Sequence, residues 1–207
     1  MKSALIIVDI QYDFLPGGRL PVKGGDQVIP VINAVQGRFA IVAATQDWHP
    51  VNHASFAGSH PGKNPGDVVA IDGVAQTLWP THCVQDTRGA SLSIELERRF
   101  LRRIFHKGVE GNVDSYSTFF DNAHRRDTGL DAYLKAEGVT DVYFAGLATD
   151  YCVKYSALDA AALGYAAHVI IDACRGIDLK PGDIDAAIAE MKSAGVRIVE
   201  SKDIAFG

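Results

Sequence analysis

Short apolar runs alternate along this chain with segments whose apolar residues recur at helical spacing. Continuous apolar runs of this length are typical of strands that are buried on both faces of a parallel sheet. The predicted strands are 4–8, 39–44, 104–106, 142–145, 167–171 and 196–199. The predicted helices are 27–35, 92–101, 130–137, 150–163 and 183–194. This alternation predicts an α/β fold in which a six-stranded, mainly parallel sheet has helices on both faces.

Polar residues lie at the carboxyl ends of four predicted strands. They are Asp9, Asp47, Lys107 and the turn 146–152, which contains Cys152. The carboxyl ends of parallel strands share one edge of the sheet, and ligands bind beyond that edge. We therefore expect these groups to meet in one site.

The composition is that of an ordinary globular protein. The 207 residues include 20 basic and 25 acidic side chains, and no basic stripe is visible, which argues against a nucleic-acid partner. No apolar run approaches the ~20 residues of a membrane span, and the N-terminal run is too short for a signal peptide. The chain shows no internal repeat or linker, so we expect a single domain over residues 1–207. Its three cysteines lack a CxxC spacing, which favours a reducing compartment and predicts a cytoplasmic protein.

The stretch Asp141–Val153 predicts a buried strand, a tight turn at Gly146 and the start of a helix. Cys152 falls in the first turn of that helix, where free N–H groups and the helix dipole favour an anion and lower the pKa of a thiol. It is a candidate thiolate nucleophile. The alternative is that Cys152 is a small buried hydrophobic residue, as many free cysteines are.

Asp9 and Lys107 are the candidate partners of this thiol. A carboxylate can serve as its base where burial raises the carboxyl pKa, and an ammonium group would stabilise both anions. Taken separately, Asp9 could cap a loop and Lys107 could be a solvated lysine at a strand end.

Asp47 and His49, with His53 and the distant His82, form a candidate metal site. A carboxylate with imidazoles is a ligand set for zinc, iron or manganese. Two ligands placed two residues apart after a strand, with a third from a loop, leave positions for water, as in a catalytic site.

A set of aromatic and apolar side chains occurs in the same loops. The region 51–90 lacks periodicity, and a loop of this length in a compact domain is often functional. Small-molecule pockets are mostly apolar, so the set predicts a pocket, although core packing is the alternative for each member alone. Its members are Phe14, Leu20, Trp79, Tyr116 and Tyr151.

Together these motifs resemble the nicotinamidase/pyrazinamidase family of isochorismatase-like cysteine hydrolases, in order and over nearly the whole chain. The resembling segments are 8–14 (VDIQYDF), 46–50 (QDWHP), 79–83 (WPTHC), 107–108 (KG), 114–117 (DSYS) and 146–153 (GLATDYCV). The D-x-H and W-P-x-H-C motifs mark the branch that hydrolyses nicotinamide.

The resemblance implies a Rossmann-like three-layer α/β/α sandwich and hydrolysis of nicotinamide or pyrazinamide through a cysteine thioester, in NAD salvage. It implies a catalytic triad of Asp9, Lys107 and Cys152. It also implies an oxyanion hole from the N–H groups of Ala148 and Cys152, with a cis peptide between Leu147 and Ala148. The rival functions are hydrolysis of another small amide and non-catalytic binding of a metal or ligand.

The resemblance further implies one divalent metal ion on Asp47, His49 and His82, with zinc as the first choice and iron or manganese as alternatives. His53 then lies outside the three ligands and supports them. The ion would bind the pyridine nitrogen, Phe14 and Trp79 would flank the ring, and Leu147 would join the substrate-binding residues. The partner is a small-molecule substrate, and a homo-oligomer is left open.

Overall fold

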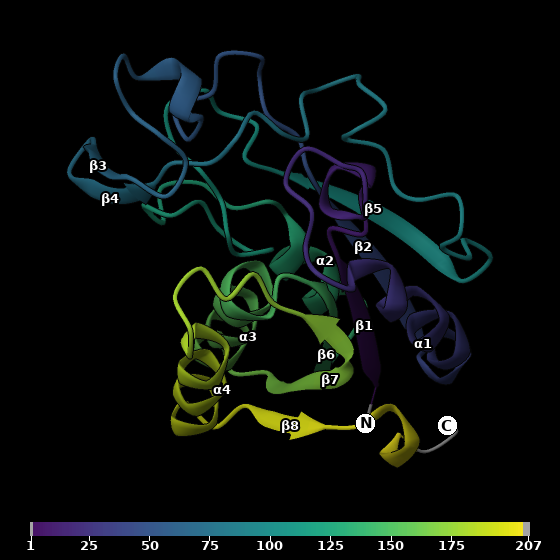
Figure 1. The fold of residues 1–207 in the computed structure, drawn as a ribbon. Coiled ribbons are helices and arrows are strands. Elements are labelled where there is room, and N and C mark those ends of the chain that lie inside the picture. Colours follow the sequence, from purple (N-terminus) through teal and green to yellow (C-terminus); the bar gives the residue numbers. More distant parts are fainter. Residues whose placement is uncertain (1, 205–207) are drawn as a thin grey trace.

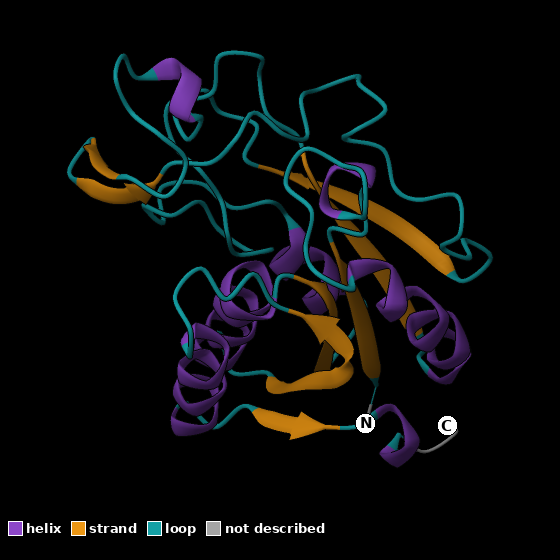
Figure 2. Ribbon diagram, in the orientation of Figure 1, coloured by secondary structure: helices purple, strands orange, loops and turns teal. Residues whose placement is uncertain are grey.

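The computed structural model describes residues 2–204, in which six parallel strands form one sheet (Figure 1). In spatial order they are β5 (Leu101–Lys107), β2 (Ile41–Asp47), β1 (Ser3–Val8), β6 (Asp141–Leu147), β7 (Ala166–Arg175) and β8 (Arg197–Val199). The helices are α1 (Val28–Val35), α2 (Leu130–Ala136), α3 (Lys154–Ala162) and α4 (Asp183–Ser193). Helices lie on both sides of the strands in Figure 2, which confirms the predicted α/β/α class.

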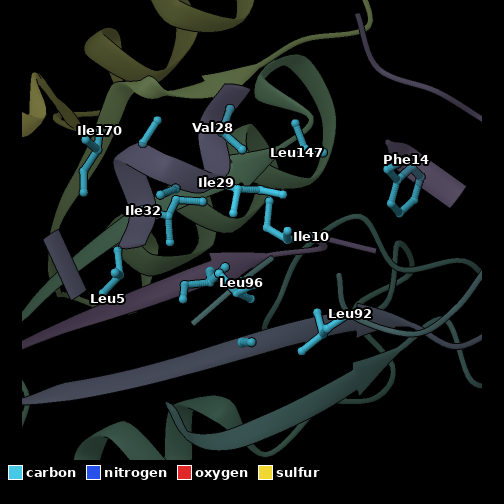
Figure 3. Packing of buried hydrophobic residues seen from close by; sticks show 14 of the residues in the cluster. Leu5, Ile10, Phe14, Val28, Ile29, Ile32, Leu92, Leu96, Leu147 and Ile170 are labelled. Carbon is cyan, nitrogen blue, oxygen red and sulfur yellow. The ribbon is translucent and has the colours of Figure 1, made fainter. Parts of the chain in front are cut away.

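The core is divided between the two faces of the sheet by the alternation of side chains along central β1. Leu5 and Ile7 pack with Ile29 and Ile32 of α1 (Figure 3). The alternate residues of β1 pack instead in the cluster that α2, α3 and α4 cover. No side chain from position 4 to position 8 is exposed, and full burial stabilises the fold by ~1.5–3 kcal/mol for each large aliphatic side chain.

β2 and β5 extend beyond the predicted apolar runs and place their last residues at the ligand-binding edge. Asp47 ends β2 and Lys107 ends β5, and the two are partners in the strand register. The amide of Gln11 supports this end, since its Nε2 donates to the carbonyl of Asp47 and its Oε1 accepts from the N–H of Asp47. The backbone N–H and carbonyl of Asp47 at the end of β2 are therefore both hydrogen-bonded.

The predicted helix over 92–101 is wrong, because this segment is irregular up to the start of β5. Leu92 and Leu96 are both buried, and their spacing of four residues imitates a helix face. Part of its backbone pairs with the loop after β1: the N–H of Ser93 donates to the carbonyl of Ile10. Tertiary contacts outweigh the local periodicity here.

A two-stranded hairpin, β3 (Val68–Ile71) and β4 (Val74–Thr77), lies within the predicted long loop. Most of its side chains are exposed or half-buried, so its strands lack the apolar alternation that signals a strand. Asp72-Gly73 at its tip, both with positive φ, was the signal that could have revealed the hairpin. Figure 1 shows the hairpin at the margin of the loop region that lies beyond the sheet.

The segment predicted as one helix over 150–163 has two parts. It starts as a π-helical turn, Thr149–Val153, and continues as α3. No helix within residues 2–204 has both the length and the apolar character needed to cross a bilayer.

Candidate active site

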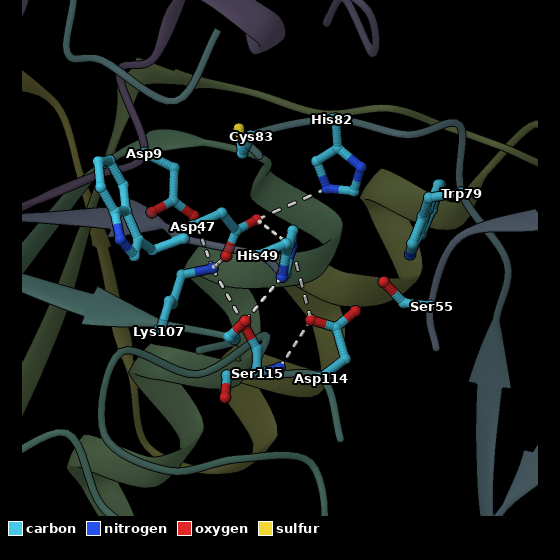
Figure 4. Close-up of polar contacts among 12 residues, drawn as sticks. Asp9, Asp47, His49, Ser55, Trp79, His82, Cys83, Lys107, Asp114 and Ser115 are labelled. Carbon is cyan, nitrogen blue, oxygen red and sulfur yellow. Dashed lines mark hydrogen bonds and ion pairs between the residues drawn. The ribbon is translucent and has the colours of Figure 1, made fainter. Parts of the chain in front are cut away.

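The carboxyl ends of β5, β1 and β6 bring Lys107, Asp9 and Cys152 together, with β2 between β5 and β1 in the sheet. The Nζ of Lys107 lies 2.8 Å from Oδ2 of Asp9 and 3.3 Å from Sγ of Cys152. It also donates to the carbonyl of Ser115 at 3.0 Å and to the carboxylate of Asp47 (Figure 4). All of these groups are buried, so the ammonium group is the charge that holds two carboxylates and a thiol in one cluster.

The backbone fixes Asp9 in this position. Asp9 follows β1 with a φ of 54°, an uncommon conformation that turns the chain out of the strand. Its Oδ1 accepts a hydrogen bond of 2.7 Å from Oγ1 of Thr45 on neighbouring β2, which leaves Oδ2 for Lys107. Thr45 is a supporting residue that the sequence did not single out.

Burial sets the protonation states of this cluster. It raises the pKa of the Asp9 carboxyl, although Lys107 opposes the rise. It would lower the pKa of Lys107, but Asp47 and Asp9 hold that pKa well above its ordinary value. Burial also raises the pKa of the Cys152 thiol well above its usual range, more than Lys107 lowers it. The shift is opposite to the lowered thiol pKa that the helix start predicts, because burial of the sulfur outweighs the opposing effect of Lys107.

One carboxylate oxygen of Asp9, one of Asp47 and the sulfur of Cys152 all lie within 4.8 Å of one another. The carboxyl whose pKa burial raises thus lies next to the thiol that must lose its proton. A carboxyl group this near the thiol is a candidate base, which must come within hydrogen-bond reach of the sulfur when it takes the proton.

Asp47, His49 and His82 offer three ligand atoms to one point. Oδ2 of Asp47 lies 3.6 Å from Nε2 of His49 and 3.8 Å from Nε2 of His82. Nδ1 of His49 bonds to the carbonyl of Gly108 at 2.9 Å, and Nδ1 of His82 bonds to the carbonyl of Pro80 at 2.7 Å. Because a carbonyl only accepts, both Nδ1 atoms carry the proton and both Nε2 atoms present a lone pair.

This donor set fits a divalent metal ion. Nε2 of His49 is buried and has no hydrogen-bond partner among the residues described, a costly state that a metal ion would relieve. Burial would raise the pKa of Asp47, but Lys107 and His49 hold it well below its ordinary value, so the ligand oxygen is anionic. Two imidazole nitrogens and one carboxylate oxygen form an open site for zinc or a similar ion.

His53 lies behind His49, with 4.3 Å between the ring centroids. Its Nδ1 accepts from the N–H of Ser55 at 3.2 Å, so its Nε2 carries the proton and donates to the carbonyl of Val113 at 3.2 Å. Both ring nitrogens are engaged away from the metal group. A supporting role of His53 from outside the ligand set stays a prediction.

A pocket opens next to both clusters. Its walls hold all five members of the predicted aromatic and apolar set together with ligand and nucleophile residues: Phe14, Leu20, Asp47, Trp79, His82, Asp114, Tyr116, Ala148, Tyr151, Cys152 and Ile177. The peptide between Leu147 and Ala148 is cis, as the resemblance implies. Leu147 itself does not line this pocket: its side chain is buried in the core cluster beneath it, because the strand alternation turns it away from the cysteine.

The sequence reasoning gave no role to Asp114 or Ile177 in the pocket wall. Asp114 was visible only as part of a resembling motif; its Oδ1 lies 3.9 Å from Nε2 of His49 and accepts from the N–H of Ser115. Ile177 follows β7 and carries no local signal that would connect it to a ligand site.

A substitution at Gly108 would test how closely the backbone there packs against the ring of His49. Its φ is 62°, and an added Cβ would lie 2.4 Å from Cε1 of His49. We expect Gly108→Ala to displace the ring and to lower the melting temperature by about 5 °C or more, as an overpacked and strained site costs ~2 kcal/mol or more. Gly62→Ala is the matched control, because Gly62 has a φ of 76° and an added Cβ meets nothing within 4 Å. Equal melting temperatures for the two variants, measured by calorimetry, would contradict the contact.

Comparisons with known proteins place nearly the whole chain in one family. The profile of the isochorismatase domain matches residues 3–203. The chain is 46% identical to a nicotinamidase of Acinetobacter baylyi over 203 residues, which cover 98% of this chain and 94% of that protein. It is also 46% identical to a nicotinamidase of Escherichia coli, with 97% and 95% covered.

Solved structures of similar proteins have the same fold along nearly the whole chain. A nicotinamidase/pyrazinamidase of Acinetobacter baumanii superposes with a TM-score of 0.96 at 45% identity and covers 99% of this chain and 98% of its own. A protein of L. infantum in complex with nicotinate gives 0.86 at 37% identity, with 99% and 95% covered. A pyrazinamidase of Pyrococcus horikoshii in complex with zinc gives 0.78 at 39% identity, with 97% and 99% covered.

Proposed function

The chain belongs to the isochorismatase family, and from this membership we propose that it hydrolyses nicotinamide, and also pyrazinamide, to the carboxylate and ammonia. One observation carries the proposal. A single apolar pocket has the thiol of Cys152 in its wall together with Asp47 and His82 of the metal-capable group. A flat amide with a ring nitrogen can meet both groups at once.

The reaction begins with proton transfer to Asp9. As the Asp9 carboxylate takes the thiol proton, the sulfur of Cys152 attacks the carboxamide carbon and the carbonyl oxygen becomes an oxyanion. Lys107 keeps its proton throughout, since its pKa lies well above its ordinary value. Its ammonium group offsets the negative charge that moves between Asp9 and the sulfur.

The tetrahedral adduct then collapses. We assign the oxyanion to the backbone N–H groups of Ala148 and Cys152, donors of a kind that contributes ~3 kcal/mol each. Asp9 returns the proton to the departing amine, so ammonia leaves and a thioester to Cys152 remains. A water molecule gives a proton to Asp9 and attacks the thioester. Asp9 passes that proton to the departing sulfur, so the thiol reforms, and the acid product loses its own proton to solvent and leaves as the carboxylate.

Asp47, His49 and His82 would hold the metal ion, for which we propose zinc, with iron or manganese as alternatives. When bound, the ion supplies a Lewis-acid contact for the pyridine nitrogen and so orients the ring. Phe14 and Trp79 flank the ring, and Leu20, Tyr116 and Tyr151 complete the apolar wall. The wall excludes water from the reacting sulfur, which strengthens the electrostatic contacts at the reaction centre.

The rival is an amidase of the same family with another small substrate. We expect rapid ammonia release from nicotinamide and pyrazinamide by the metal-loaded protein, and release at least ~100-fold slower from aliphatic amides, which lack ring contacts and a ring nitrogen. Coupled ammonia assays measure all three under one condition. A preference for an aliphatic amide would replace this function by the rival, and no release from any amide would favour a non-catalytic binder.

The three cysteines are free, and we propose a cytoplasmic enzyme whose small-molecule product enters NAD salvage.

A further inference from the structure

The β3–β4 hairpin sends one buried side chain toward the pocket. Within its two strands Gln76 is 3% exposed, whereas every other residue is half-buried or exposed. A buried amide costs free energy unless it is hydrogen-bonded, so its partners indicate why it is there.

Gln76 contacts two residues of the pocket wall and two residues outside it. Its Nε2 lies 2.7 Å from the carbonyl of Thr77, 3.2 Å from Oδ2 of Asp114 and 3.1 Å from the hydroxyl of Tyr116. Its Oε1 accepts from Nδ2 of Asn122 at 3.3 Å. Because the Thr77 carbonyl and a carboxylate only accept, the NH₂ end of the amide must face them.

The two pocket residues are held on their other sides as well. Oδ1 of Asp114 accepts from the N–H of Ser115 at 2.8 Å, and the hydroxyl of Tyr116 accepts from Nε1 of Trp79 at 3.1 Å. Asp114, Tyr116 and Trp79 all line the pocket beside Cys152. In Figure 4, a dashed line joins the Asp114 carboxylate to His49. The amide of Gln76 therefore ties a charged and an aromatic part of the wall to one point.

We propose that Gln76 is a positioning residue of the active site, which fixes the Asp114 carboxylate and the Tyr116 hydroxyl so that the pocket is shaped before the substrate enters. The hairpin thus contributes to the structure of the active site, although most of its side chains lie at the surface. The effect on catalysis rests on the proposed function. Gln76 does not reach the reacting sulfur, so its contribution is uniform binding, which appears in KM and not in kcat.

The variant Gln76→Glu keeps the shape of the side chain and places a carboxylate against Asp114. We expect KM for nicotinamide to rise ~10-fold or more while kcat stays within ~3-fold, since loose placement of a ring weakens ground-state and transition-state binding alike. The matched control is Ala70→Glu, which adds the same charge at an exposed position of the same hairpin and should leave both constants unchanged. An unchanged KM in a folded Gln76→Glu protein would overturn the proposal.

A double-variant cycle separates this role from general damage. In Asp114→Asn the new amide can keep its oxygen on Ser115 and turn its NH₂ toward position 76, where a glutamate would accept it. The increase in KM caused by Gln76→Glu should therefore shrink to less than a third of its size in the Asp114→Asn background. An equal increase in both backgrounds would show that the Gln76–Asp114 contact is not what matters.

A measurement without turnover keeps the inference separate from the proposed reaction. The chain has two tryptophans, and the Trp79 indole N–H shares the Tyr116 hydroxyl with Gln76, whereas the Trp48 ring stacks on His106. In ¹H–¹⁵N spectra, Gln76→Glu should shift the Trp79 indole resonance and leave that of Trp48 in place, and Ala70→Glu should shift neither. An unmoved Trp79 resonance would overturn the positioning role, whether or not the protein hydrolyses nicotinamide.

Discussion

Cys152→Ala is expected to abolish ammonia release from nicotinamide, with a fall in kcat of at least ~1000-fold, because no covalent intermediate can form without the sulfur. The fold should survive the change. Lys107 loses the thiol but keeps the carboxylates of Asp9 and Asp47 and the carbonyl of Ser115 as partners. Circular dichroism and metal content should match the unmodified protein, so the loss of turnover reports the chemistry.

The two other cysteines are the matched controls. Cys83 and Cys174 are buried in the two core clusters, and neither lines the pocket. Cys83→Ala and Cys174→Ala should therefore retain much of the activity. Iodoacetamide should modify Cys152 first, since it is the cysteine that the pocket exposes to a small reagent. Faster labelling of Cys83, or full turnover by Cys152→Ala, would move the nucleophile elsewhere.

The meeting of polar residues at one edge of the sheet was predictable because one rule of α/β topology applies to every strand. Asp9, Asp47 and Lys107 each follow or end an apolar run, and parallel strands must bring their carboxyl ends to one edge. The same rule needs no knowledge of which strands are neighbours. It could not provide the register that pairs Asp47 with Lys107, which depends on contacts along the whole sheet.

The protonation state of Cys152 was not predictable from its local position. A helix start favours a thiolate by a local effect, whereas the pKa of the folded site follows from how completely the surrounding segments bury the sulfur. Burial of this kind comes from residues far apart in the sequence. The side on which Leu147 lies was missed for a related reason: a motif next to the cysteine does not tell which side of the strand faces the pocket.

The hairpin and its buried glutamine show the limit of periodicity. Gln76 lies 38 residues from Asp114 and 40 from Tyr116, and each contact joins two irregular or weakly patterned segments. Hydrophobic patterns predict elements that pack on the core. They carry no information on polar side chains that pair across loops, which are the contacts that shape this pocket.

The second large effect concerns the ring nitrogen. Benzamide has nearly the size and apolar surface of nicotinamide but no ring nitrogen. Under the proposed binding mode it would pack between Phe14 and Trp79 and still lack the contact that fixes its direction. Misplacing a reacting group by ~1 Å can cost ~100-fold in rate. We expect kcat/KM of the metal-loaded protein to be at least that much lower for benzamide than for nicotinamide.

His82→Ala supplies the internal comparison. His82 lines the pocket together with Cys152, and its Nε2 faces Asp47 Oδ2 at 3.8 Å, so its loss should remove the bound ion, as elemental analysis can verify. Nicotinamide turnover should then fall toward the benzamide value, while benzamide turnover changes little, because benzamide never used the ion for orientation. If the ion acted mainly by activating water, His82→Ala would slow both amides equally, since water activation is indifferent to the ring nitrogen. The ratio of the two kcat/KM values, before and after the substitution, therefore distinguishes orientation of the ring from activation of water.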